Sequence, residues 1–193
     1  MGSDIQMQLD VCTSYGAPRK EAEKALRTTS LWMDRARKKW EEEIARGKYG
    51  GLFFPIVQGN FFPDLRAESA ARVIATEPPG IAVGGLSVGE PEEAFYEYLA
   101  LTAALLPDAL PRYVMGIGTP QYILAAIEHG IDMFDCVLAT RNARNGNMFT
   151  SRGAFALKKA ENRLDFLPID EECACKVCSS YSRAYLRHLF KSR

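Results

Sequence analysis

Residues 112–137 read RYVMGIGTPQYILAAIEHGIDMFDCV, which has the pattern of a strand, a helix and a second strand. Apolar runs at either end predict two buried strands, 112–115 and 131–137. Between them, Thr119 is placed to cap the free amides of a helix that starts with proline, and Gly130 permits a left-handed exit. Strands joined by such a crossover pair in parallel. This stretch therefore predicts an α/β fold.

The same alternation extends toward the N-terminus. Further strands are expected at 5–9, 53–57 and 80–83, and amphipathic helices at 18–46, 63–75 and 91–106. Alternating strands and helices form either a doubly wound sheet or a (β/α) barrel, and the pattern alone leaves both open. In both folds the chemistry lies at the carboxyl ends of the strands.

After Gly153 the pattern changes to a charged segment, a cysteine cluster and a basic helix. We therefore expect one domain over residues 1–153 and an appended subdomain over 154–193. Lysine plus arginine equals aspartate plus glutamate at 24 each, so any nucleic-acid contact must come from a local basic patch. Neither a membrane span nor a secretory signal is indicated, and we expect a cytoplasmic protein.

Three of the five cysteines, Cys173, Cys175 and Cys178, form the cysteine cluster near the end of the chain. Three thiolates so close together favour a structural zinc site, which needs a fourth ligand. His188 lies ten residues further, within a helical pattern; we favour the alternative, a ligand beyond Arg193, and expect weak metal retention. The odd cysteine count argues against disulfides and agrees with a reducing compartment.

Two aspartates end predicted strands. Asp135, in GIDMFDC at 130–136, is placed to be partly desolvated yet reachable, as a nucleophile requires. Asp10 ends the first strand in the same manner. The alternative for each is a residue that caps a loop. Spacing alone does not assign their roles.

Two loops carry groups that suit ligands. The sequence GGLSVGE at 84–90 has three glycines, which let backbone amides approach a ligand, although a tight strand-to-helix turn would use the same residues. The sequence TRNARNG at 140–146 offers arginine and asparagine donors suited to RNA phosphates and base edges. Its alternative is a solvated hairpin turn built on Asn145 and Gly146.

Several segments share their order and approximate spacing with one known family. They are SDI at 3–5, LDVC at 9–12, IVQG at 56–59, DLR at 64–66, GGLSVGE at 84–90, YVMGIGTP at 113–120, residues 130–144 and the cysteine cluster. On these segments the chain resembles the bacterial tRNA-guanine transglycosylases, and the resemblance covers its whole length. It implies a (β/α)8 barrel of TIM type with a zinc-binding subdomain near its end.

The resemblance also implies an activity. Family members exchange guanine at the wobble position of certain tRNAs for 7-aminomethyl-7-deazaguanine, a step toward queuosine. By resemblance, Asp135 attacks the ribose C1′ and forms a covalent aspartyl-ribosyl intermediate, which the incoming base then displaces. Arg141 and Arg144 would hold the anticodon loop of the tRNA, the cysteine cluster would bind zinc, and the full-length protein would be a homodimer.

The base pocket implied by the resemblance is built from strand-end residues. Asp10 would read the donor edge of the base, and Gln58 and the backbone amide of Gly85 would face its carbonyl oxygen. The carbonyl of Leu86, supported by Glu90, would meet the aminomethyl group. The remaining residues implied at the pocket are Cys12, Gly84 and Met115.

The chain also departs from the family pattern. Pro55 and Asn60 replace glycines around IVQG, and a proline removes a donor from a strand. About five strand–helix units are predicted, where a closed barrel has eight, and the family's second catalytic aspartate is expected upstream of Met1. We therefore expect a truncated C-terminal half of the enzyme, a partial barrel with little activity alone. The alternative is a non-catalytic tRNA-binding protein or subunit.

Overall fold

The computed structural model describes residues 3–47 and 50–192. The chain divides into two compact units, Met1–Cys136 and Val137–Arg193, which we call unit 1 and unit 2 and describe separately. The boundary between the units follows Cys136, whereas the sequence pattern predicted a domain boundary at residue 153. The predicted subdomain therefore lies within unit 2, together with residues that the sequence pattern grouped with the strands.

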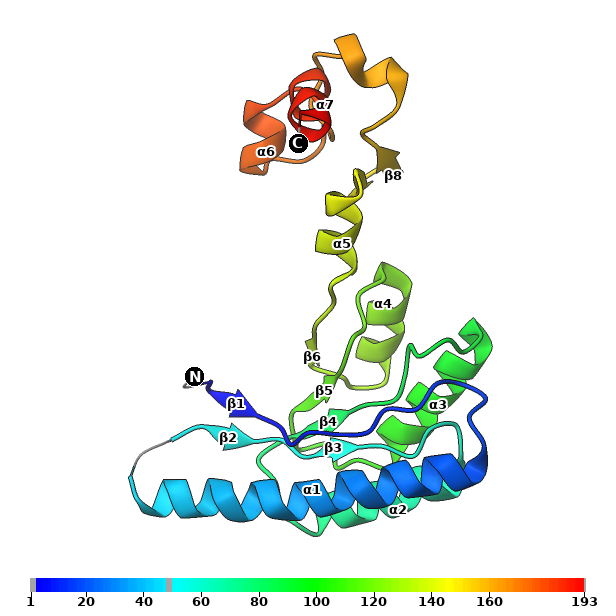
Figure 1. The fold of residues 1–193 in the computed structure, drawn as a ribbon, viewed down its shortest axis with the longest axis vertical. Coiled ribbons are helices and arrows are strands. Elements are labelled where there is room, and N and C mark those ends of the chain that lie inside the picture. The colour runs from blue at the N-terminus through cyan, green and yellow to red at the C-terminus, as the bar shows by residue number, and fades with distance from the viewer. Residues whose placement is uncertain (1–2, 48–49, 193) are drawn as a thin grey trace. The chain divides into compact units, whose positions relative to one another are not determined.

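Unit 1 is an α/β unit with parallel strands (Figure 1). A four-stranded sheet has the order β3 (Ile56–Val57), β4 (Ile81–Val83), β5 (Arg112–Val114) and β6 (Met133–Phe134), and β1 (Ile5–Gln6) pairs with β2 (Leu52–Phe53). The helices are α1 (Arg19–Ala45), α2 (Pro63–Ile74), α3 (Glu92–Ala104) and α4 (Pro120–Glu128). The predicted alternation of strands and helices is confirmed, with strands shorter than the apolar runs.

The strand order indicates how the helices are layered. Because β3 to β6 follow one another across the sheet without reversal, right-handed crossovers place all their connecting helices on the same face. Consecutive helices accordingly touch, α1 with α2, α2 with α3 and α3 with α4. The helices that connect these strands therefore form one layer over the sheet.

The core of unit 1 lies between that sheet and its helices. Val57, Val83 and Val114 are almost completely buried and belong to one cluster with residues of α2, α3 and α4, among them Val73, Leu99 and Ala126. This packing fixes the strands, and it therefore also fixes the positions of the residues that directly follow their carboxyl ends.

Pro55 divides the strand that the sequence predicts over 53–57. Because proline has no N–H to donate to a neighbouring strand, it separates β2 from β3, although its carbonyl still accepts from the amide of Ala82 at 3.0 Å. The next amide, that of Ile56, donates to the side-chain oxygen of Gln8 at 3.2 Å. A buried side chain therefore continues the hydrogen bonding where the ladder is broken.

The predicted cap at Thr119 is wrong. Its side chain makes no capping hydrogen bond to α4, and its buried hydroxyl has no partner in the part of the chain that the structure describes. The backbone carbonyl of Thr119 accepts from the amide of Ile123 at 3.0 Å, so the helix begins where expected without the side chain. Gly130 follows the helix with φ of 76°, as predicted.

Unit 2 has short elements only. They are α5 (Leu138–Arg144), an antiparallel hairpin of β7 (Asn147–Thr150) and β8 (Gly153–Ala156), the 3-10 helix η1 (Ala160–Leu164), α6 (Lys176–Ser180) and α7 (Arg183–Lys191). The hairpin turn considered at Asn145 and Gly146 is wrong. These residues end α5, where the amide of Gly146 donates to the carbonyl of Ala143 at 2.9 Å.

Charge is distributed unevenly between the units. Unit 1 contains nineteen acidic residues against thirteen lysines and arginines, whereas unit 2 contains five acidic residues against eleven lysines and arginines. The neutral total therefore hides a basic unit 2, the kind of local excess that binding to nucleic acid requires. Among the described residues, no helix combines the length and the apolar character of a membrane span.

Candidate active site and metal centre

Four residues form one row across the carboxyl ends of the sheet. Val57 is in register with Val83, Val83 with Val114, and Val114 with Phe134. The residues that directly follow these strand ends are Gln58, Gly84, Met115 and Asp135. Neighbouring strands lie about 4.8 Å apart, so four of the predicted site residues line one edge of the sheet.

Asp135 is exposed, so the expectation that it is partly desolvated is wrong, and two donors hold one of its oxygens. The hydroxyl of Tyr113 donates to Oδ1 at 2.6 Å, and the backbone amide of Gly116 donates to the same oxygen at 2.8 Å. Burial and the bond to Asp135 both raise the pKa of Tyr113, so its hydroxyl keeps its proton at neutral pH. The carboxylate is therefore fixed in orientation yet accessible, as a nucleophile requires.

Asp10 and Gln58 contact each other across different segments of unit 1. The side-chain amide nitrogen of Gln58 donates to Oδ2 of Asp10 at 2.5 Å. Gln58 is buried, and its backbone amide donates to the hydroxyl of Ser69 at 3.0 Å. The expectation that Asp10 ends the first strand is wrong, since β1 ends at Gln6, and it is this bond that brings Asp10 to the row of strand ends.

The two glycines after β4 allow a close approach to Gln58. A Cβ atom on Gly84 would lie 2.6 Å from Nε2 of Gln58, and one on Gly85 would lie 2.5 Å from Oε1. Gly85 also has φ of 71°, a conformation that residues with a Cβ rarely adopt. Only glycine fits both positions while the Gln58 side chain stays in place.

Cys12 lies beside the same groups. Burial raises the pKa of the Cys12 thiol, and the charge of Asp10 raises it further. Hydrogen bonds from the Gln58 side chain and from the backbone amide of Gly85 act in the opposite direction on this pKa. Cys12 therefore lies close to Asp10, Gln58 and Gly85, and Gln58 contacts Asp10 directly.

Glu90 closes the glycine-rich loop. Its carboxylate accepts from the backbone amides of Ser87 and Val88, the latter at 2.7 Å. The Ser87 N–H belongs to the same peptide unit as the Leu86 carbonyl, so Glu90 fixes the direction of that carbonyl. Leu86 itself is buried. This geometry supports the expected role of Glu90 behind Leu86.

The sequence predicted no role for Arg66, which appears there only as part of the segment DLR at 64–66. Its side chain is fully buried and donates to backbone carbonyls of two strand-end loops, those of Asn60, Gly84 and Gly85. The available signal was its helical spacing from Ser69 and Val73, which places an arginine on the inner face of α2.

Arg141 and Arg144 lie in unit 2, both exposed on α5. As neighbours three positions apart near the end of a helix, they present two cations on one side of it.

The cysteine cluster is confirmed as a group that could hold a metal ion. The Sγ atoms of Cys173, Cys175 and Cys178 all lie within 4.8 Å of one another. Tetrahedral zinc with thiolate bonds of about 2.3 Å needs sulfurs roughly 3.8 Å apart, so a small contraction would fit them to zinc. Within the described residues the cluster contains no histidine, and His188 lies exposed on α7.

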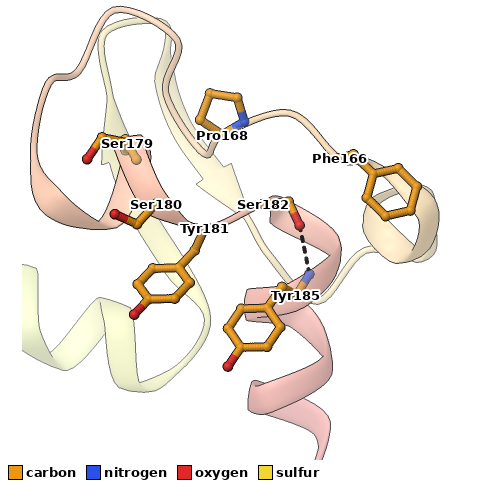
Figure 2. A pocket seen from close by; sticks show the side chains of 8 residues that line it. Phe166, Pro168, Ser179, Ser180, Tyr181, Ser182 and Tyr185 are labelled. Carbon is orange, nitrogen blue, oxygen red and sulfur yellow. Dashed lines mark hydrogen bonds between the residues drawn. The ribbon is translucent and has the colours of Figure 1, made fainter.

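A hollow of about 570 Å³ lies beside Cys178 in unit 2 (Figure 2). Figure 2 shows Tyr181 and Tyr185 side by side, with stacked rings whose centroids are 5.4 Å apart. The hydroxyl of Ser182 accepts from the amide of Tyr185 at 3.2 Å and caps α7. The sequence analysis did not anticipate this hollow, and of its predicted site residues only Cys178 lines it.

Comparison with known proteins identifies the family. The family model described as Queuine tRNA-ribosyltransferase matches residues 1–193. The chain belongs to the queuine tRNA-ribosyltransferase family. A queuine tRNA-ribosyltransferase of Treponema denticola is 53% identical over 99% of this chain, which is 50% of the relative. Those of Desulforapulum autotrophicum and Solidesulfovibrio magneticus are 51% and 52% identical over 100% and 98% of this chain, respectively.

This family is one of pentosyltransferases, and the resemblance seen in the sequence is confirmed. The chain spans about half the length of the curated relatives it matches, 50% or 51% of each. In this member of the queuine tRNA-ribosyltransferase family, unit 1 brings together the predicted pocket residues and Asp135 at one edge of a parallel sheet. The predicted RNA-binding arginines and metal ligands lie in unit 2.

Proposed function

We propose that this chain carries the nucleophile and the base pocket of an enzyme that exchanges guanine in tRNA for 7-aminomethyl-7-deazaguanine. The observation that carries the proposal is the carboxylate of Asp135, oriented through Oδ1 by Tyr113 and Gly116. It stands in the same row as Gln58 and Gly84, two of the residues proposed to bind the base.

In the proposed reaction, a carboxylate oxygen of Asp135 bonds to the ribose C1′ as the bond from C1′ to N9 of guanine breaks. The electron pair of that bond leaves with guanine, which takes up a proton. The incoming base loses its N9 proton, attacks C1′ and displaces the carboxylate, so configuration is retained after two inversions. Tyr113 and Gly116 hold Asp135 in line throughout.

The pocket would recognise the base through the groups already gathered in unit 1. Asp10 accepts hydrogen bonds, as the donor edge of a guanine-like base requires, while the Gln58 side chain and the Gly85 amide donate toward its carbonyl oxygen. Without a base, Asp10 and Gln58 bond each other. A bound base would therefore replace this hydrogen bond, and both partners would gain a new one.

We further propose that unit 1 is part of a (β/α)8 barrel wall and that unit 2 is a zinc-binding subdomain that contacts RNA. Cys173, Cys175 and Cys178 would hold the metal, which would supply a structural crosslink. Arg141 and Arg144, in the basic unit, would pair with phosphates of the anticodon loop.

The test is transfer of radiolabelled guanine into tRNA by the full-length gene product that contains these residues, compared with its Asp135→Asn variant. We expect the variant to lose at least about a thousandfold in rate, because an amide cannot form the ester-like intermediate. Asp132→Asn is the matched control, since Asp132 accepts from the backbone amide of Arg112 outside the row. Binding of tRNA without incorporation would favour the non-catalytic alternative.

A further inference from the structure

Arg66 is a buried cation whose partners are backbone carbonyls. In the described part of the chain, Nε donates to the carbonyl of Asn60 at 2.7 Å. Both terminal nitrogens donate to the carbonyl of Gly84 at 3.3 Å, and one also donates to that of Gly85 at 3.0 Å. Burial lowers the pKa of Arg66 to about 10, so the side chain is still charged at neutral pH. Charged donors make stronger hydrogen bonds than neutral ones.

These bonds fix the peptide unit that presents the pocket amide. The carbonyl of Gly84 and the N–H of Gly85 belong to one planar trans peptide and point in opposite directions. Arg66 binds that peptide through its carbonyl side. The Gly85 N–H, at the opposite edge of the peptide, then points toward Cys12. Gln58 and Asp10 also lie in that direction.

The local backbone needs such a restraint. Two successive glycines lack side chains that would limit rotation, and peptide units beside glycine reverse at little steric cost. On the far side of this loop, Glu90 fixes the peptide between Leu86 and Ser87. Arg66 therefore restrains the part of the loop that Glu90 does not reach.

We propose that Arg66 is a positioning residue that sets selectivity for purines with a carbonyl oxygen, by aiming the Gly85 N–H at that oxygen. The inference rests on the proposed function, since it assumes that unit 1 binds a guanine-like base. It adds a determinant of specificity that does not touch the base, acting through the peptide between Gly84 and Gly85.

The test compares guanine with 2-aminopurine, which keeps the 2-amino group but lacks the 6-carbonyl oxygen and the N1–H that accompanies it. The missing N1–H affects the wild type and the variant alike, so it cancels when their preferences are compared. Dissociation constants for both are measured calorimetrically with this chain and with Arg66→Met. We expect the preference for guanine to fall roughly tenfold, the value of one well-made hydrogen bond, with affinity for 2-aminopurine unchanged. Arg72→Met is the matched control, since Arg72 is exposed on the same helix and pairs with Asp34.

A second pair of variants keeps the outcome interpretable. Should Arg66→Met fail to fold, Arg66→Lys retains the charge but not the planar fork, and its guanine preference should also fall. A folded Arg66 variant with the wild-type preference overturns the inference. Asp10→Asn tests the pocket itself, because Asp10 would accept from the 2-amino group that both purines carry. If Asp10→Asn leaves both affinities unchanged, the proposed function fails, and the inference fails with it.

Discussion

The two units are stabilised in different ways. Unit 1 has a continuous apolar cluster between sheet and helices, whereas the buried apolar side chains described in unit 2 are Leu157 and Ile169. Unit 2 instead contains polar links such as Arg183 to Asp165 at 2.8 Å, together with the cysteine cluster that could hold a metal. Small domains cannot bury enough apolar surface to fold without such additions. The chemistry of the proposed reaction therefore lies on the unit that its own core makes rigid.

The largest effect should come from removing metal. With zinc supplied in excess, to offset the weak retention expected of three ligands, and then withdrawn by a chelator, we expect residues 137–192 to lose protection from hydrogen exchange while the sheet of unit 1 keeps it. Structural zinc contributes on the order of 10 kcal/mol to folding in small modules, more than the core of unit 2 could replace. Mass spectrometry of exchanged peptides measures both units in one experiment.

Cysteine substitutions provide the control for that experiment. Cys175→Ser should abolish zinc binding and mimic chelation, because a hydroxyl is a poor zinc ligand. Cys12→Ser, a change in unit 1, should leave the metal content and the exchange of unit 2 as they are. Full protection of residues 137–192 without metal would show that unit 2 folds by itself and would remove the contrast between the units.

A cavity in the core of unit 1 should have the next largest effect. Leu99 on α3 is fully buried, and Leu99→Ala should lower the free energy of unfolding of unit 1 by about 3 kcal/mol. Leu124 on α4 is 63% exposed, so Leu124→Ala should cost less than about 0.5 kcal/mol. Urea denaturation followed by tryptophan fluorescence measures both, since both tryptophans lie in α1 of unit 1. Equal costs would mean that α3 does not pack as described.

A smaller effect is expected when single arginines are removed from the basic unit 2, which we propose contacts RNA. An anticodon stem-loop RNA should bind the chain with a salt dependence that weakens when Arg141→Ala or Arg144→Ala is introduced. Each lost phosphate contact should reduce the slope of log affinity against log salt by about 1. Arg35→Ala, an exposed position in unit 1, is the control. If the Arg35 variant had the larger effect, RNA would bind to unit 1 instead.

The sequence predicts the alternation of elements in unit 1 because period and proline positions are local signals. It also places Gln58, Gly84, Met115 and Asp135 at strand ends. It does not reveal the shared register of those strands, which depends on pairing between segments far apart in the chain. Nor does it predict the loss of the Thr119 cap, because a hydroxyl that suits the free amides can be buried elsewhere by packing.

Unit 2 shows the other limit of local signals. Asn145 and Gly146 match the pattern of a hairpin turn, yet they end α5, since the same two residues also suit a helix terminus. The spacing of the cysteines predicted their cluster correctly, because residues so near in sequence can meet without long-range folding. The contacts of Arg66 could not be predicted, since its partners lie on loops 6, 18 and 19 residues away.

The smallest predicted effect concerns Tyr113. Its folded pKa is raised above the unfolded value of about 10, so its contribution to stability is fully present below pH 10 and is lost as pH rises through the folded value. The ultraviolet difference between wild type and Tyr113→Phe should therefore show no tyrosinate as the pH passes 10. Chelating the metal should leave this titration unchanged, because Tyr113 and Asp135 both belong to unit 1. Ionisation of Tyr113 near pH 10 would mean that its bond to Asp135 is not kept. Ionisation that appears only after metal is removed would mean that unit 1 does not hold its nucleophile independently of unit 2.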